Sequence, residues 1–177
     1  MDAESAQPVE TASARARRSA AQRLEAAQNK VVVIGLSHKT ASVQVREKLS
    51  VPEKDWQAVQ RKIAALPHIK EAAIISTCNR HEIYFVTPDY NKGVREVTKH
   101  LSEAHNVSKQ DLRESLFMLA EKDAVWHALR VASGLDSLVI GEGQILSQMK
   151  KCYELSTDKA GAAGKVFFSA TCVRARD

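Results

Sequence analysis

Short apolar runs alternate with amphipathic stretches along most of the chain. Residues 31–36 are mostly β-branched and are followed by polar residues from Ser37 onward, a pattern typical of a buried strand. Residues 71–76 and 82–87 form two further apolar runs, and the polar residues between them predict a tight hairpin. A fourth strand, a short one, is predicted at 116–119.

Apolar residues at helical spacing fill the intervals between these strands. Pro52 fits the first turn of a helix, because its missing N–H would have no partner there. Helices are predicted at 51–66, 93–105, 120–131, 144–156 and 166–176. The resulting order, β-α-β-β-α-β followed by helices, is the signature of a ferredoxin-like split sheet.

The predicted fold class is therefore α+β. We expect a ferredoxin-like split β-α-β sheet, mostly antiparallel, with helices on one face and linker helices after it. Residues 1–29 are rich in Ala, Ser, Gln and Arg and are expected to form a disordered or weakly helical tail. This tail faintly resembles an organelle transit peptide, although its acidic residues are untypical of one. Residues 30–140 would hold the sheet domain, and residues 141–177 a helical segment.

Composition narrows the classes of protein. The chain has 177 residues and is 44% hydrophobic, enough for one core-bearing domain with an appendage. A net charge of +5 suits a polyanionic partner such as RNA, but it is common among proteins without one. The three cysteines, Cys78, Cys152 and Cys172, do not form a disulfide framework, and their spacing indicates no zinc site. No apolar run approaches the ~20 residues that span a bilayer.

Cys78 is the strongest candidate for chemistry. It lies where an apolar run ends, between Thr77 and Asn79, so we expect it to be exposed at a turn and yet held still. Hydrogen-bond donors and positive charge nearby favour the thiolate, which is the nucleophilic form of cysteine. Arg80 would face the same way as Cys78 if the strand pleat continued, and would pair with a substrate carboxylate. The alternative for Arg80 is a solvated hairpin charge.

Several other polar residues lie near this turn or in a second candidate segment. His127, on a predicted helix, is either structural or a proton donor and acceptor. His81 has odd spacing from Cys78, which points it elsewhere. In a split sheet the first and third elements are neighbours, so residues 37–39, Ser-His-Lys, would lie near the Cys78 turn.

The segment Gly-Glu-Gly-Gln at 141–144 lacks the third glycine of a dinucleotide-binding fingerprint, so we reject it as a cofactor site. Glu142 and Gln144 would instead bind a polar ligand at the start of a helix, or cap that helix.

Three blocks of the chain, taken in order, resemble the N-terminal catalytic part of glutamyl-tRNA reductase. The first is Val-Ile-Gly-Leu-Ser-His-Lys-Thr at 33–40 with Arg-Glu-Lys-Leu at 46–49. The second is Ser-Thr-Cys-Asn-Arg at 76–80 with Glu-Ile-Tyr at 82–84. The third is Ala-Ser-Gly-Leu-Asp-Ser-Leu-Val-Ile-Gly-Glu-Gly-Gln-Ile-Leu at 132–146. The resemblance runs from about residue 30 to residue 151. Within the family, the chain resembles the plant and algal branch.

The resemblance implies a mechanism and a site. The thiolate of Cys78 would attack the ester of glutamyl-tRNA, release the tRNA and leave a glutamyl thioester. A hydride from NADPH would then give glutamate-1-semialdehyde, the precursor of tetrapyrroles. This reaction is the first step of tetrapyrrole biosynthesis. Cys78 and His127 would be the catalytic residues. The substrate glutamate would be held by Thr77, Arg80, Ser137, Glu142 and Gln144. The implied location is the chloroplast stroma, or the cytoplasm if the source is bacterial.

The chain also departs from the family pattern. The family continues through a long helix into an NADPH-binding domain and a dimerisation domain, whereas this sequence ends at Asp177. We therefore expect the chain to form the thioester without completing the reduction, and its relation to the family's homodimer stays open. Ser42 replaces a proline of the family's first loop, which would alter the stiffness of that loop.

Two other functions remain open from the sequence. One is a non-catalytic module that binds the tRNA, the whole enzyme or a regulatory protein of tetrapyrrole synthesis. The other is an unrelated cysteine hydrolase, which the three ordered blocks disfavour.

Overall fold

The computed structural model describes residues 29–157 of the chain. Within this part, the strands pair in the order β2-β3-β1-β4, and every pair is antiparallel. The strands are β1 (Lys30–Ser37), β2 (Glu71–Ser76), β3 (Arg80–Thr87) and β4 (Phe117–Ala120). The ferredoxin-like split sheet and the adjacency of its first and third strands are thereby confirmed.

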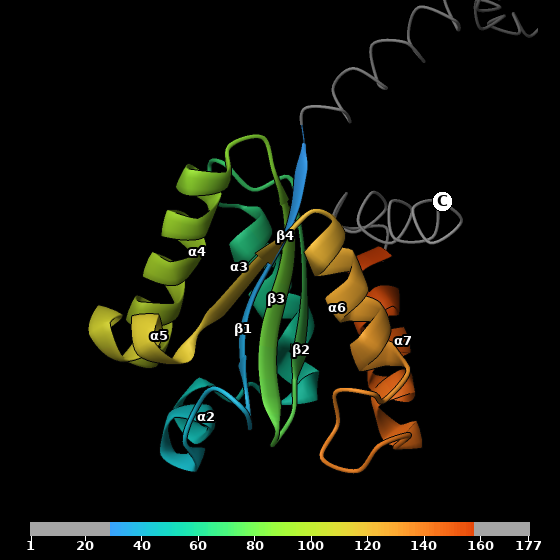
Figure 1. Cartoon of the computed structure of the whole chain (residues 1–177). Helices are drawn as coiled ribbons and strands as arrows, with labels where there is room; N and C mark the ends of the chain where they lie inside the picture. The colour runs from blue at the N-terminus through green and yellow to red at the C-terminus, as the bar shows by residue number, and fades with distance from the viewer. Residues whose placement is uncertain (1–28, 158–177) are drawn as a thin grey trace, which may run out of the picture.

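Helices connect and cover these strands (Figure 1). They are α2 (Val43–Leu49), the 3₁₀ turn η1 (Glu53–Asp55), α3 (Trp56–Ala64), α4 (Tyr90–His105), α5 (Lys109–Ser115), α6 (Lys122–Ala132) and α7 (Gly143–Thr157). The helix predicted at 51–66 is divided into η1 and α3. The short helices α2 and α5 were not expected, and the helix predicted at 166–176 lies outside the described residues.

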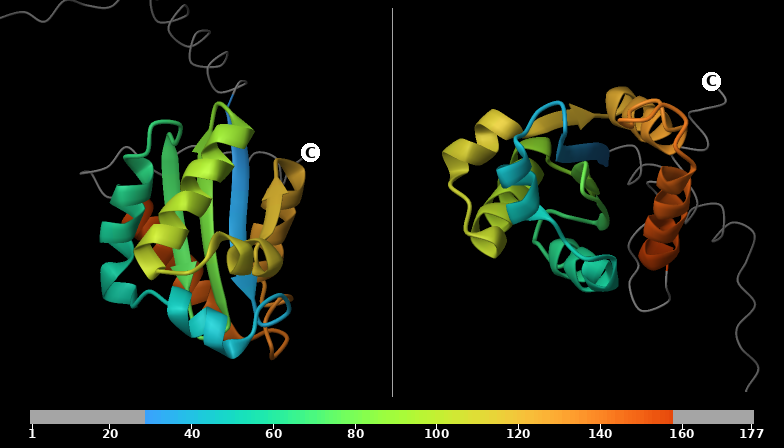
Figure 2. Two further views of the ribbon diagram at one scale, coloured as in Figure 1. Left: turned by 90° about the vertical axis from the view of Figure 1, so that its left-hand side faces the viewer. Right: turned by 90° about the horizontal axis from the view of Figure 1, so that it is seen from below.

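Helices lie on both faces of the sheet, where the pattern predicted only one covered face. The left view of Figure 2 shows α4 in front of the strands, α3 beside β2, and α6 and α7 farther back. Every residue of β2 and of β3 is buried, including the charged ones. An antiparallel sheet with one solvated face would alternate buried and exposed residues instead.

The helix α7 belongs to this second layer. Ile145, Met149 and Cys152 recur at helical spacing and are buried in the same core as the sheet. The boundary predicted at residue 140 therefore does not coincide with a break in the core. Residues 158–177, the rest of the predicted linker, lie outside the described part of the chain.

Alternation along β3 sorts its side chains between the two helical layers. Glu82 faces α6, because His127 of that helix contacts its carboxylate. His81, one residue earlier, faces α4 and meets the ring of His105 there. The charged side chains of β3 thus collect in the layer between the sheet and α6.

Gly35 in the middle of β1 makes room for one of these charged side chains. It pairs with Glu82 in the β1–β3 register. A Cβ atom at Gly35 would lie 2.7 Å from Cγ of Glu82 and 2.8 Å from the carbonyl oxygen of His81. A glycine inside a strand often marks such a close approach.

Gly35→Ala should therefore destabilise the fold by about 1–3 kcal/mol, because the added methyl group meets backbone atoms that cannot move away cheaply. Urea denaturation of the purified chain measures the change. Gly143→Ala is the matched control, since a Cβ at Gly143 meets nothing within 4 Å. Equal stability losses in the two variants would contradict this account of Gly35.

Candidate active site

Cys78 lies at the tip of the hairpin that joins β2 to β3. The N–H of Thr77 donates to the carbonyl oxygen of Arg80 over 2.8 Å, which leaves Cys78 and Asn79 as a two-residue connection. The Thr77 hydroxyl oxygen accepts hydrogen bonds from the backbone N–H groups of Asn79 at 3.2 Å and Arg80 at 3.3 Å. The turn is thus held from inside by Thr77, and Cys78 is exposed, as predicted.

Two neighbouring segments hold the same turn from outside. Nε of Arg46 on α2 donates to the carbonyl oxygen of Cys78 at 3.2 Å, while its Nη1 donates to Ala41 at 2.9 Å. The backbone N–H of His38 donates to the carbonyl oxygen of Asn79 at 2.9 Å. The end of β1 therefore lies beside the cysteine turn, which confirms that expectation from the split sheet.

A small pocket opens at this turn. Its volume is about 50 Å³, and its wall is formed by Thr77, Cys78, Asn79, Arg80, Ser137, Leu138, Glu142, Gln144, Ile145 and Gln148. Six of the seven predicted site residues line it, although they come from segments nearly 60 positions apart. Gln148 is not among the predicted residues. It stands four positions after Gln144 on α7, so helical spacing would have placed both amides on one face.

Arg80 lines the pocket but is not the free hairpin charge that one interpretation of the sequence allowed. Its side chain is only 2% exposed. Nη1 donates to Oε1 of Glu82 at 2.6 Å and to Oδ2 of Asp136 at 3.3 Å. Nη2 donates to the carbonyl oxygen of Asp136 at 2.7 Å and to its Oδ2 at 3.3 Å. The guanidinium is therefore oriented by two carboxylates before any ligand arrives.

Glu82 is the fully buried partner of Arg80. Its Oε1 also accepts a hydrogen bond from Nε2 of His127 at 3.1 Å, and its Oε2 accepts one from the Tyr84 hydroxyl at 2.6 Å. Burial alone would raise the pKa of Glu82, but the hydrogen bond and charge of His127, the charge of Arg80 and the Tyr84 hydroxyl outweigh it, and the pKa is lowered. Glu82 is thus an ionised carboxylate whose two oxygens are both satisfied.

His127 is the one predicted site residue that does not line the pocket. Its Nε2 contacts Glu82, and its ring packs against Phe117 with the ring centroids 4.9 Å apart. An ionised carboxylate only accepts hydrogen bonds, so Nε2 of His127 carries the proton. A proton-transfer role would need His127 near Cys78. Its polar contact is instead with Glu82, which holds Arg80.

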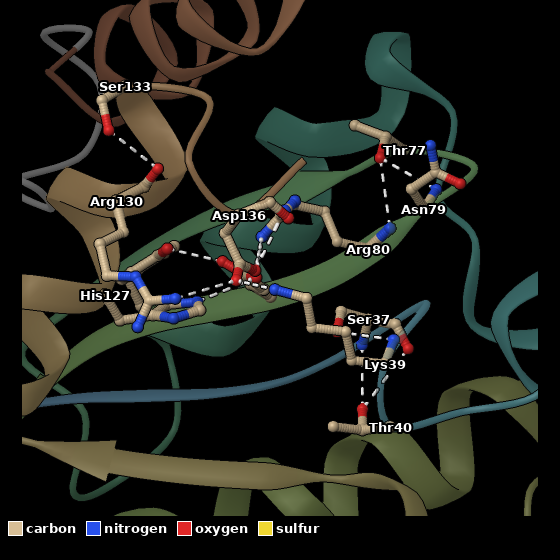
Figure 3. A network of polar contacts seen from close by, with 12 residues as sticks. Ser37, Lys39, Thr40, Thr77, Asn79, Arg80, His127, Arg130, Ser133 and Asp136 are labelled. Carbon is tan, nitrogen blue, oxygen red and sulfur yellow. Dashed lines mark hydrogen bonds and ion pairs between the residues drawn. The ribbon is translucent and has the colours of Figure 1, made fainter. Parts of the chain in front are cut away.

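Asp136 is not among the predicted site residues, yet three cations meet at its carboxylate. Nζ of Lys39 lies 2.5 Å from Oδ1, Arg80 donates to Oδ2, and Nη2 of Arg130 lies 3.7 Å from Oδ1. Figure 3 shows these side chains converging from different elements. The sequence signal was weak, because a lone aspartate next to Ser137 resembles ordinary loop polarity.

His81 points to the opposite side of the sheet, as its odd spacing from Cys78 predicted. Its Nδ1 lies 3.2 Å from the Ser76 hydroxyl, and its ring meets that of His105. Burial, then the neighbouring charge of His105, lowers the pKa of His81 to about 3, although Glu82 opposes the shift.

Comparison with known proteins shows the family of the chain. The model of the glutamyl-tRNA(Glu) reductase N-terminal domain matches residues 34–172. The chain belongs to the glutamyl-tRNA reductase family.

Named glutamyl-tRNA reductases resemble the chain at 49–59% identity. The one from Thermosynechococcus vestitus is 59% identical over 125 residues, and the alignment covers 71% of this chain and 29% of the relative. The one from Cyanothece sp. is 55% identical over 131 residues, or 74% of this chain and 30% of the relative. The one from Cyanophora paradoxa is 52% identical over 131 residues, or 74% of this chain and 30% of the relative. The chain therefore spans about 30% of the length of these curated relatives.

A solved structure supports the same assignment. Glutamyl-tRNA reductase from Methanopyrus kandleri superimposes with a TM-score of 0.56 and 25% sequence identity. The superposition covers 82% of this chain and 33% of the archaeal one.

Ser42 stands where the family pattern described above has a proline. It is the N-cap of α2, with φ −64° and ψ 161°. Proline fixes φ near this value, so the backbone before α2 has a conformation that proline would also allow.

No helix in residues 29–157 is long and apolar enough to cross a bilayer. No group of three histidine, cysteine or acidic side chains in the same range is placed to hold a metal ion.

The buried His81 should make stability depend on pH. The folded protein keeps His81 neutral down to a pH of about 3, whereas the unfolded chain protonates it below about 6.5. Stability is then complete above pH 6.5 and falls as the pH decreases, by at most about 1.4 kcal/mol per pH unit from this residue. His81→Gln should flatten the dependence of the unfolding free energy on pH between 6.5 and 4.5, measured by urea denaturation.

The window above pH 4.5 separates this effect from that of the carboxylates. Glu82 and Asp136, whose pKa values are lowered, lose their stabilising contribution only at more acidic pH. The lowered pKa values of the other histidines remain in both proteins. These histidines are His38, His100 and His105. An unchanged slope in His81→Gln would show that His81 is not held neutral by the fold.

Proposed function

We propose that this chain performs the thioester-forming step of a glutamyl-tRNA reductase. The proposal rests on one observation. Cys78 is exposed at the tip of a hairpin that hydrogen bonds hold in place, and it lines a pocket with mostly polar residues. Its thiolate would attack the ester carbonyl of glutamyl-tRNA and form a sulfur–carbon bond. The bond from that carbonyl to the terminal ribose oxygen breaks, and the tRNA leaves with the electron pair and takes up a proton. Covalent capture divides a difficult reduction into two easier steps.

The lining of the pocket suits a glutamyl group, which carries one ammonium and one carboxylate. We propose that the carboxylate of Glu142 binds the substrate ammonium. The side chains of Ser137, Gln144 and Thr77 would make hydrogen bonds to the glutamyl group. We assign the substrate carboxylate to the Arg80 side of the pocket, where the guanidinium, already oriented by Glu82 and Asp136, supplies positive charge. A charged group that is fixed before binding loses little free energy in reorganising when the substrate arrives.

The segment at 141–144 does not fit a nicotinamide cofactor. It spans the end of the loop after α6 and the start of α7, whereas the glycine-rich turn of a dinucleotide-binding unit follows a strand. NADPH remains the hydride donor that the family resemblance implies. No described residue of this chain is assigned to the hydride-transfer step.

Other properties of the whole family stay proposals for this protein. They are the use of glutamyl-tRNA as substrate, a homodimeric assembly, binding of regulatory proteins of tetrapyrrole synthesis, and a location in the chloroplast stroma or, for a bacterial source, the cytoplasm. The named relatives come from cyanobacteria and the alga Cyanophora paradoxa, which supports either location. Residues 1–28 of the tail that resembles a transit peptide lie outside the described residues.

Mass spectrometry after incubation with glutamyl-tRNA tests the proposed step. We expect a glutamyl adduct on Cys78 that is absent in Cys78→Ser. Cys152→Ser is the matched control and should keep the adduct. Cys152 is buried, and burial raises its pKa to about 12, so this thiol stays protonated and unreactive. An adduct that persists in Cys78→Ser would overturn the proposal, and tRNA binding without any adduct would favour the non-catalytic module.

For His127 we propose a positioning role, exerted through Glu82 on Arg80. His127→Ala should slow adduct formation about ten-fold or more, because it removes a hydrogen bond to a buried charge. His127→Gln, whose side-chain amide can donate from a similar place, should recover most of the rate. The pH profile of the rate should keep its shape in both variants. A general acid or base would instead lose one limb of that profile in both.

A further inference from the structure

The two walls of the Cys78 pocket come from segments far apart in the sequence. One wall is the hairpin turn at 77–80, and the other is formed by residues 137–148. Asp136 immediately precedes the second wall. Among the described residues, Arg80 of the turn donates hydrogen bonds to its carboxylate and to its carbonyl oxygen. Core packing through Ile145 and Met149 places α7, and the Arg80–Asp136 contact places the loop before it against the cysteine turn.

Asp136 also connects the pocket to two further elements. Lys39, just beyond β1, contacts Oδ1 at 2.5 Å, and Arg130 on α6 approaches the same oxygen at 3.7 Å. Lys39 follows His38, whose N–H donates to Asn79 in the cysteine turn. Figure 3 shows Asp136 between these groups. One carboxylate thus joins β1, β3 and α6 beside the pocket.

The backbone that carries Asp136 is itself well defined. At the end of α6, the N–H of Gly134 donates to Val131 and the N–H of Leu135 donates to Arg130, both over 3.0 Å. Gly134 has a φ of +72°. This is the Schellman arrangement that commonly ends a helix with a left-handed glycine. Asp136 therefore leaves the helix in a set direction.

The loop that follows closes back on the same glycine. The carbonyl oxygen of Gly134 accepts hydrogen bonds from the N–H of Ser137 at 3.3 Å and of Gly141 at 3.2 Å. A Cβ at Gly134 would lie 3.0 Å from Cα of Gly141, so the two glycines allow a close approach. Ser137 and Glu142 are thus presented by a compact loop whose first anchor is Asp136.

Asp136 is a charged anchor. Burial alone would raise its pKa, but the Lys39 hydrogen bond and the charges of Arg80, Lys39 and His127 outweigh it, so the pKa is lowered and the side chain is a carboxylate at neutral pH. Only 9% of its side chain is exposed. Its charge-assisted contact with Lys39 is short, at 2.5 Å, while Arg80 reaches Oδ2 at 3.3 Å and the carbonyl oxygen of Asp136 at 2.7 Å.

We propose that Asp136 is the positioning residue that sets the glutamate-binding wall of the pocket against Cys78. This inference rests on the proposed function, because it names the residue that aligns the substrate ester with the thiolate. Asp136 touches neither the thiolate nor the substrate and acts through Arg80 and the adjoining loop.

The test compares Asp136→Asn, which keeps the shape and removes the charge, with the wild-type chain. The single-turnover rate of Cys78 acylation at saturating glutamyl-tRNA should fall by about 10²-fold, the usual effect of misplacing a reacting group by roughly 1 Å. The tRNA concentration that gives half the maximal rate should change little. Asp136→Glu keeps the charge at a longer reach and should give an intermediate rate.

Two controls separate positioning from a general loss of structure. Alkylation of Cys78 by iodoacetamide should be unchanged in Asp136→Asn, because Thr77 and Arg46 still hold the turn. Asp123→Asn alters an exposed carboxylate in the first turn of α6 and should leave both reactions unchanged. If Asp136→Asn does not fold, Lys39→Met replaces it, and slower acylation with unchanged alkylation is again expected.

Hydrogen exchange distinguishes failure of this inference from failure of the proposed function. Asp136→Asn should speed exchange at the loop amides of Ser137, Gly141 and Glu142, with or without tRNA. Wild-type acylation that Asp136→Asn leaves unchanged would overturn the inference and spare the proposed function. If the wild-type chain is not acylated, the proposed function fails, and unchanged exchange at these amides would then overturn the positioning role as well.

Discussion

The layer between the sheet and α6 depends on one buried carboxylate. Glu82 has no exposed surface and sits in the central strand β3, where an ion without partners would be very costly. Its environment supplies what it needs: Arg80 two residues earlier on the same face, Tyr84 two residues later, and His127 from α6. Gly35 on the neighbouring strand leaves the space for its side chain. Removing one partner of such a buried pair typically lowers the free energy of unfolding by about 3–5 kcal/mol. A substitution at one of these positions therefore affects the others.

This constraint reaches the chemistry through Arg80, the first residue of β3. Glu82 and Asp136 hold its guanidinium below the hairpin, while Thr77 and Arg46 hold the turn that exposes Cys78. Cys152 shows the opposite arrangement. It faces the buried core, where desolvation and the charge of Glu82 raise its pKa to about 12. The same carboxylate thus helps to keep one thiol protonated and to support the turn that presents the other.

Sequence patterns predicted the features that depend on neighbours along the chain. Strand periodicity located β2 and β3, the polar turn located Cys78, and the odd spacing correctly turned His81 away. Coverage of both sheet faces was not predicted, because the charged residues within β3 obscured its complete burial. Two seven-residue helices, α2 and α5, are too short to show a clear period. Asp136 lies 56 positions from Arg80, so only the folded structure shows that they meet.

The resemblance to a family grouped residues that the structure divides into two kinds. Ser137, Glu142 and Gln144 form the wall of the pocket, whereas His127 stands behind it and reaches the pocket only through Glu82 and Arg80. A motif cannot separate these kinds, because substitution in either would disturb the same site. Physical contact does separate them. A wall residue acts on the ligand that it touches, while a supporting residue acts on the geometry of another side chain. Most of the ionised groups that the structure places near Cys78 contact one another, so their positions are fixed without a ligand, which is the arrangement that preorganised electrostatic catalysis would use.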